Sequence, residues 1–357
     1  MTSKFPFISG CKISTNNRGL VTFSGVPAVD TLLNGGLVVG SLCLYIDEIG
    51  DYSQYFTKCF AAEGLASSQS VYAAGYFENS QLFSETLPEL CEDISKNRLP
   101  VEPLPCNRDI LDDLSSIAWR YKNLPIVDTT VEQQNLSSTR SFSRKNVMDK
   151  SFLAKCDFSE YEFDFSQPIC HYLEVLRYLK QKLSDDRYNL TSAGPKNLLR
   201  IVLMNLESPL WHINGKMLNF VFAVKCLIRE KSAVVLISFS DNAIRPDVAK
   251  RIVHHCDVVF KLKALFKGNS MKIGKFYEGY KGLIYVEKLP LVNCLHFSVP
   301  DCLDLAFKWK KESLVIEKLH TPPDIDESGD NKSQILYTMS MSASGCASNM
   351  SNSKLDF

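Results

Sequence analysis

Residues 41–77 constrain the fold of this chain more than any other part of the sequence. Residues 41–46 are a short apolar run of the kind found in a buried strand. The next apolar side chains have the spacing of an amphipathic helix, at Tyr52, Tyr55, Phe56, Cys59 and Phe60. A second apolar run follows at 70–77. Strand, helix and strand over this length are typical of a βαβ unit, so the sequence predicts a parallel α/β sheet.

The turn between the first strand and the helix lacks the chemistry of a phosphate-binding loop. Such a loop needs glycines whose backbone N–H groups cup phosphates, a lysine for the terminal phosphates, and a serine or threonine for magnesium. The turn here reads Asp47, Glu48, Ile49, Gly50 and Asp51. It has a single glycine, no lysine, and carboxylates that would repel a nucleotide's phosphates. The frame of a nucleotide-binding domain is therefore predicted with its phosphate-binding signature lost.

The same patterns extend the α/β reading along the chain. Apolar periodicity predicts helices at 171–183, 217–228 and 246–255, and buried strands at 20–23, 198–206 and 233–239. Strands at 257–262, 282–289, 295–299 and 313–319 follow one another without intervening helices. These last strands predict an antiparallel C-terminal extension of the sheet.

Composition divides the chain into a core with loose ends. We expect a loose segment at 1–18, a core domain at 19–323, and a disordered tail at 324–357, where serine, asparagine, methionine and charged residues dominate. Within the core, prolines and polar residues at about 78–167 predict a long, partly disordered insertion with one ordered island at 117–125.

The charge and cysteine content exclude several classes of function. Lysine plus arginine equals aspartate plus glutamate, so any nucleic-acid contact needs a local patch or a surface shared with partners. The twelve cysteines include no CxxC pair, and neither a metal site nor a cofactor is predicted. No apolar stretch is long enough to cross a membrane and no signal peptide is evident, so we expect an intracellular protein.

Several motifs carry a resemblance to a known family. They are GVPAVDTLLNGGL within 25–40, residues 117–125, NLESPLW at 205–211, and a C-terminal block that includes KLP at 288–290, DLAFK at 304–308 and IEKLHTPPD at 316–324. The closing residues Lys354, Leu355, Asp356 and Phe357 belong to the same set. The ordered parts resemble a RecA-type ATPase core, and more specifically the family of Elongator complex subunit 4.

This resemblance implies a function and a set of partners. Members of the family lack the phosphate-loop signature and form a RecA-like heterohexameric ring with subunits 5 and 6. The ring docks on the larger Elongator subunits, including the catalytic one, and binds tRNA. The complex modifies the wobble uridine (U34) of tRNA anticodons. The resemblance thus implies an accessory subunit rather than an enzyme, in the cytoplasm and, as a second location, the nucleus. ATP hydrolysis by such a ring would need composite sites between subunits.

Two regions carry candidate site residues. Glu207 follows the strand at the place where a RecA core keeps a magnesium-binding acid. We interpret it either as a substitute for that acid, shifted by two residues, or as a capping or interface residue. Positions that match the pore loops of RecA-like rings, 208–216 and 240–250, bring together candidates for tRNA contact. These candidates are Trp211, His212, Lys216, Arg245, Lys250 and Arg251. The alternative reading is that the cations are solvated and Trp211 is packed.

Two other functions stay open at this point. The chain could be an active RecA-like ATPase with a variant phosphate site, which requires magnesium-dependent ATP binding that replacement of Gly50 abolishes. It could also be a scaffold that binds only protein partners, in which case replacing the loop cations leaves tRNA affinity unchanged.

Overall fold

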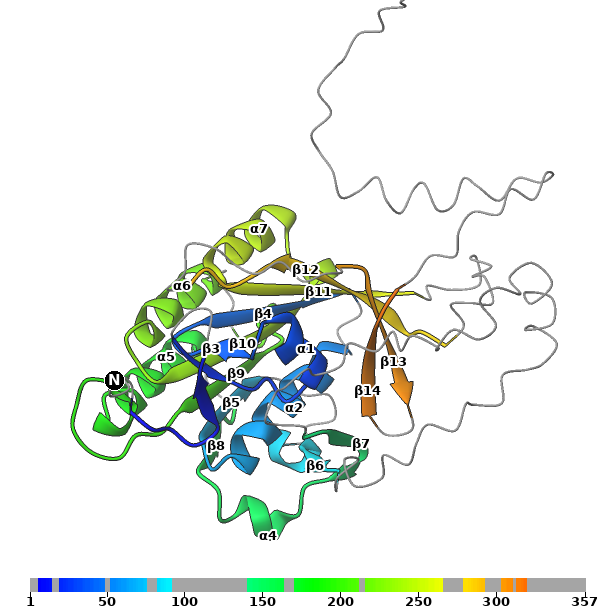
Figure 1. Cartoon of the computed structure of the whole chain (residues 1–357). Helices are drawn as coiled ribbons and strands as arrows, with labels where there is room; N and C mark the ends of the chain where they lie inside the picture. Colours follow the sequence, from blue (N-terminus) through cyan, green and yellow to red (C-terminus); the bar gives the residue numbers. More distant parts are fainter. Residues whose placement is uncertain are drawn as a thin grey trace, which may run out of the picture. The chain divides into compact units, whose positions relative to one another are not determined.

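A nine-stranded sheet runs through the core of the chain (Figure 1). The structure, a computed structural model, describes residues 6–14, 19–48, 52–75, 82–91, 140–163, 170–211, 216–265, 279–292, 303–310 and 313–319. In spatial order the strands are β14 (Ser313–Lys318), β13 (Leu305–Lys310), β12 (Gly282–Lys288), β11 (Val258–Ala264), β4 (Leu42–Asp47), β10 (Ala233–Ser240), β9 (Leu199–Met204), β5 (Ser70–Gly75) and β8 (Phe158–Glu160).

The direction of the strands confirms the predicted α/β class, with a mostly parallel central sheet and an antiparallel C-terminal extension. The six strands from β11 to β8 are parallel to one another, and β12, β13 and β14 add to one edge in antiparallel pairs. The βαβ unit read from the sequence is present, but its two strands are not neighbours. Strands β10 and β9 lie between β4 and β5.

Helices cover both faces of the parallel strands (Figure 1). The helices α1 (Pro27–Leu32) and α2 (Tyr52–Ala66) pack on one face, and α5 (His171–Lys182), α6 (Met217–Ile228) and α7 (Pro246–His255) pack on the other. Side chains of the central strands alternate between these two apolar layers, so strands such as β4 and β10 are buried on both sides. This double coverage explains their nearly continuous apolar sequences.

Small elements extend the core where the sequence predicted little order. Strand β1 (Cys11–Ile13), inside the segment expected to be loose, pairs with β2 (Leu20–Thr22), which in turn pairs with β3 (Leu37–Val38). Four elements besides β8 form within the expected insertion: η2 (Phe83–Thr86), β6 (Pro88–Leu90), β7 (Phe142–Val147) and α4 (Lys150–Leu153). Two further single-turn helices are η5 (Asp186–Tyr188) and η6 (Asp241–Ala243).

Some expectations fall on residues outside the described ranges. These are the island at 117–125, the strand at 295–299 and the tail at 324–357. Strand β13 was not predicted as a strand and is a finding of the structure. Within the part of the chain that the structure describes, no helix has the length and apolarity that a membrane span requires.

An arginine side chain lies fully inside the core. Arg200 on β9 is 0% exposed, and it donates hydrogen bonds to the Gln69 side chain (2.6 Å), the Phe60 carbonyl (2.9 Å) and the Thr22 hydroxyl (2.7 Å). Burial lowers the pKa of Arg200 to about 10, against the opposing effect of Glu63, so the guanidinium stays charged at neutral pH. Arg200 therefore ties β9 to α2 and β2.

Candidate functional site

The turn after β4 keeps the frame of a phosphate loop and none of its binding groups. Strand β4 ends at Asp47 and helix α2 begins at Tyr52. If Asp47 takes the first glycine position of the signature, its lysine position falls on Ser53, and one residue later it falls on Gln54. Neither side chain can supply a positive charge to a phosphate. Gly50 and Asp51 lie outside the described residues.

A carboxylate of the protein occupies the position that a phosphate oxygen would take at α2. The Asp47 side chain is fully buried, and its Oδ2 accepts a hydrogen bond of 2.7 Å from the backbone N–H of Ser53, in the first turn of the helix. Anions bind at helix N-termini because the first N–H groups have no partner within the helix and the helix dipole favours negative charge. Asp47 supplies that anion from within the chain.

The neighbouring residue Glu48 anchors the turn through its backbone. Its N–H donates to the Leu262 carbonyl of β11 (3.1 Å), and its carbonyl accepts from the Asn242 side chain (2.8 Å). Asn242 belongs to the connection between β10 and α7. The three C-terminal strand ends of β4, β10 and β11 are thus linked by protein contacts at the edge where a nucleotide would bind.

The Glu207 side chain links the segment after β9 to the end of β10. Its Oε1 accepts a hydrogen bond of 2.9 Å from the backbone N–H of Ser240, at the end of β10. Burial raises the pKa of Glu207, partly offset by hydrogen bonds from backbone N–H groups that include Ser240. This geometry supports the capping interpretation. Among the described residues, no cluster of three His, Cys, Asp or Glu side chains could hold a metal ion.

The burial of Trp211 corrects its assignment as a tRNA-contact residue. Trp211 is 0% exposed, its ring stacks on Tyr172 at 5.3 Å between centroids, and Phe163 meets it edge-on at 5.1 Å. The indole N–H donates to the Met204 carbonyl at 3.3 Å. No ring face is left for a base, because aromatic neighbours from other segments cover it. His212, the next candidate, lies outside the described residues.

The remaining cationic candidates are exposed, and three of them gather at α7. Arg245 stands at the N-cap position of this helix and forms an ion pair with Asp247, while Lys250 and Arg251 lie on the exposed face of the helix. In the described part of the chain, neither Lys250 nor Arg251 has an acidic partner. Lys216 is exposed at the start of α6, the helix that packs against α7.

One exposed aromatic residue was missed by the sequence reading. Phe222 on α6 is 52% exposed, although it lies in a strongly apolar helix. The buried positions of α6 are Met217, Phe220, Val221, Val224 and Ile228, which leaves Phe222 on the opposite side. An aromatic residue off the apolar stripe of an amphipathic helix is the signal that could have identified it.

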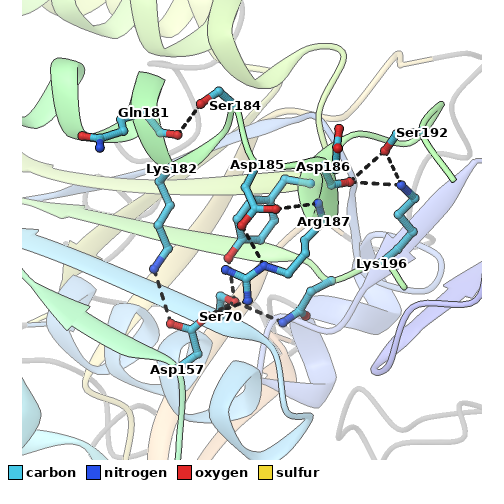
Figure 2. A network of polar contacts seen from close by, with 12 residues as sticks. Ser70, Asp157, Gln181, Lys182, Ser184, Asp185, Asp186, Arg187, Ser192 and Lys196 are labelled. Atoms are coloured by element: carbon cyan, nitrogen blue, oxygen red, sulfur yellow. Dashed lines mark hydrogen bonds and ion pairs between the residues drawn. The ribbon is translucent and has the colours of Figure 1, made fainter. Parts of the chain in front are cut away.

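The opposite edge of the parallel sheet carries charges that neutralise one another (Figure 2). Ser70 at the start of β5 donates to Asp157 (2.6 Å), and Lys182 donates to the other oxygen of that carboxylate (3.3 Å). Burial alone would raise the pKa of Asp157, but Ser70, Lys182 and Arg187 together lower it. These cations are engaged with acids of the same network, so this edge is not a candidate surface for a polyanion.

Comparison with known protein families shows to which family the chain belongs. Residues 4–357 match the PAXNEB protein family. The chain belongs to this family. The match extends over almost the whole sequence, including the degenerate turn at 47–51 and the residues of α6 and α7.

Curated relatives confirm the resemblance to Elongator complex subunit 4. The chain is 28% identical to "Elongator complex protein 4" of Danio rerio, over 99% of this chain and 93% of the relative. It is 28% identical to the protein of that name from Mus musculus (98% and 89%) and 27% identical to that from Homo sapiens (92% and 83%).

Two solved structures match the chain at low sequence identity and low TM-score. A KaiC-like protein from Pyrococcus horikoshii OT3 is 13% identical with a TM-score of 0.45, covering 83% of this chain and 98% of that one. The flagellar accessory protein FlaH from Methanocaldococcus jannaschii is 11% identical with a TM-score of 0.43, covering 82% and 95%.

Proposed function

We propose that the chain is a non-catalytic subunit of an Elongator complex. It forms a RecA-like heterohexameric ring with subunits 5 and 6, docks with them on the larger subunits that include the catalytic one, and the ring binds tRNA during wobble-uridine modification. The name shared by its curated relatives supports membership in the complex. The ring, the tRNA and the modification rest on the family resemblance of the sequence motifs. The cytoplasm, and secondarily the nucleus, is the location this function requires.

The observation that carries the non-catalytic role is the Asp47 carboxylate at α2. A nucleotide phosphate placed there would meet the buried Asp47 carboxylate, which already accepts the N–H of Ser53, and neither Ser53 nor Gln54 supplies the lysine of a phosphate loop. The protein's own anion thus serves the structural role that phosphate has in an active loop. These contacts favour a RecA-like scaffold that has lost its nucleotide-binding site.

Nucleotide binding separates this role from the active-ATPase alternative. A ligand present at a hundred times its Kd would stabilise the protein by about 2.7 kcal/mol. We expect Mg-ATP to leave the thermal midpoint of the purified full chain unchanged, because the Asp47 carboxylate repels phosphate. Saturable, magnesium-dependent ATP binding that is lost on Gly50→Ala would contradict this role and favour the ATPase alternative.

The role of Asp47 in the helix predicts a graded loss of stability. We expect Asp47→Ala to lower the free energy of unfolding by about 1–2 kcal/mol, the usual cost of removing a helix-capping acceptor. Asp47→Asn keeps an acceptor oxygen and should lose less. Urea denaturation of the full chain measures both, and an alanine variant as stable as wild type would show that the bond to Ser53 contributes nothing.

Recovery of the assembled complex tests the rest of the proposal. The tagged full chain, purified from cells, should bring down subunits 5 and 6 and the larger subunits, identified by mass. The complex should bind tRNA with an affinity that falls as salt rises, since phosphate contacts release counterions. A complex of the right composition with no affinity for tRNA would leave the chain as a protein-binding scaffold.

A further inference from the structure

Helices α6 and α7 present an exposed aromatic ring beside a second flat ring. Phe222 is 52% exposed on α6, and its ring centroid lies 5.3 Å from that of His255, at the end of α7. The His254 ring follows at 5.9 Å from His255. Single exposed apolar side chains are common on protein surfaces, so exposure alone marks no site. What distinguishes Phe222 is the second ring beside it.

The exposed face of α7 adds positive charge beside these rings. Lys250 and Arg251 are neighbours on the exposed side of the helix, one turn before His254, and neither cation has an acidic partner within the described ranges. We call Phe222, Lys250, Arg251, His254 and His255 the α6–α7 patch. Its cations differ from Arg245, which is bound by Asp247.

Two lysines beneath the patch fix its shape. Lys225 donates to the His255 carbonyl, and Lys288 donates to the carbonyls of His254 (3.0 Å) and Cys256, so the free carbonyls at the end of α7 are capped. The nearby carboxylate of Asp257 is mostly buried and bonds Arg229 (2.9 Å) and Lys225 (3.4 Å).

Burial, together with the surrounding cations, keeps one ring of the patch uncharged. Burial lowers the pKa of His255, and Lys225, His254, Arg251 and Lys288 lower it further. The His255 ring is therefore neutral at pH 7, next to Phe222, and the positive charge comes from the side chains around it.

We propose that the α6–α7 patch is an RNA contact in which Phe222 stacks on an unpaired base while Arg251 and Lys250 hold the adjacent phosphates. Exposed aromatic rings with nearby unpaired cations are the groups that recognise splayed-out bases and their backbone. A nucleotide supplies both groups in one unit, a flat base for the ring and a phosphate for the cations, whereas a carboxylate supplies only a charge. This inference rests on the proposed tRNA-binding function and replaces the buried Trp211 with Phe222 as the stacking residue.

The test uses the assembled complex that contains the full chain and an unmodified tRNA transcript with uridine at the wobble position. Phe222→Ala should weaken tRNA binding at least about fivefold, the lower end for removal of one stacking aromatic residue. Phe222→Tyr should restore the affinity, because the stacking ring is kept. A plot of log affinity against log salt concentration has a negative slope, and Lys250→Ala should make it less steep by about 0.7, the value for one phosphate contact of a single strand.

Matched controls lie on the neighbouring helix α5. Leu173 is 44% exposed and Lys180 is also exposed, so Leu173→Ala and Lys180→Ala remove similar groups outside the patch. Both should leave tRNA binding unchanged.

The outcomes distinguish this inference from the function on which it rests. A wild-type complex that fails to bind tRNA overturns both. Normal tRNA binding by the Phe222→Ala complex overturns the patch alone. If Phe222→Ala instead prevents the complex from assembling, the patch is a protein interface and the RNA assignment is wrong.

Discussion

Replacing Arg200 with alanine is expected to lower the free energy of unfolding by about 3–5 kcal/mol, the range for breaking a buried charged network by removing one member. The guanidinium is 0% exposed and its hydrogen bonds satisfy Gln69, the Phe60 carbonyl and Thr22. The variant removes the Arg200 donor from each of these buried acceptors and opens a cavity beside them. Denaturant unfolding of the purified full chain gives the difference.

Two further variants make this result specific. Arg177 is an exposed arginine whose ion pair is with Glu174 one turn away, so Arg177→Ala should change stability by less than about 0.5 kcal/mol. Arg200→Lys keeps the charge but cannot direct three separated donors, and it should fall between wild type and Arg200→Ala. An Arg200→Ala protein as stable as Arg177→Ala would show that the network contributes no net stability.

Local sequence patterns predicted the individual helices and strands well, but they did not predict which strands pair with one another. The apolar spacing predicted the start of α2 at Tyr52 and the full extent of α7, because helical periodicity is written in residues a few positions apart. The insertion of β9 and β10 between β4 and β5 could not be read this way, since pairing between strands far apart in sequence depends on packing of the whole sheet. Strand β8 was hidden in a polar stretch for the same reason.

The candidate site was predictable in what it lacks and less so in what its residues do. Missing glycines and lysine predicted the loss of the phosphate signature, but the bond from Ser53 to Asp47 depends on the direction of one carboxylate. Trp211 sits in a loop by sequence, yet Tyr172 and Phe163, from other segments, draw its ring into the core. Phe222 carried a readable signal in its place off the apolar stripe of α6.

Gly25→Ala is expected to destabilise the chain by about 3 kcal/mol or more, because backbone strain and overpacking add at this position. Gly25 has a φ of +85°, in the left-handed region that favours glycine, and a Cβ there would lie 2.3 Å from the Cys59 carbonyl oxygen of α2. The contact is with backbone inside a helix, so it cannot be relieved by rotating a side chain. The segment before α1 would have to move away from α2.

Gly194→Ala separates the two contributions. Gly194 also has a positive φ, of +107°, but no heavy atom of the described residues lies within 4 Å of the place that a Cβ would take, so only the conformational strain of about 1–2 kcal/mol should remain. The difference in unfolding free energy between the two variants then measures the cost of the steric overlap between a Cβ at position 25 and the backbone of α2. Equal losses of stability would mean that the segment around Gly25 moves away from α2 at little cost. Gly25 would then be needed for the conformation of the turn and not for its packing against α2.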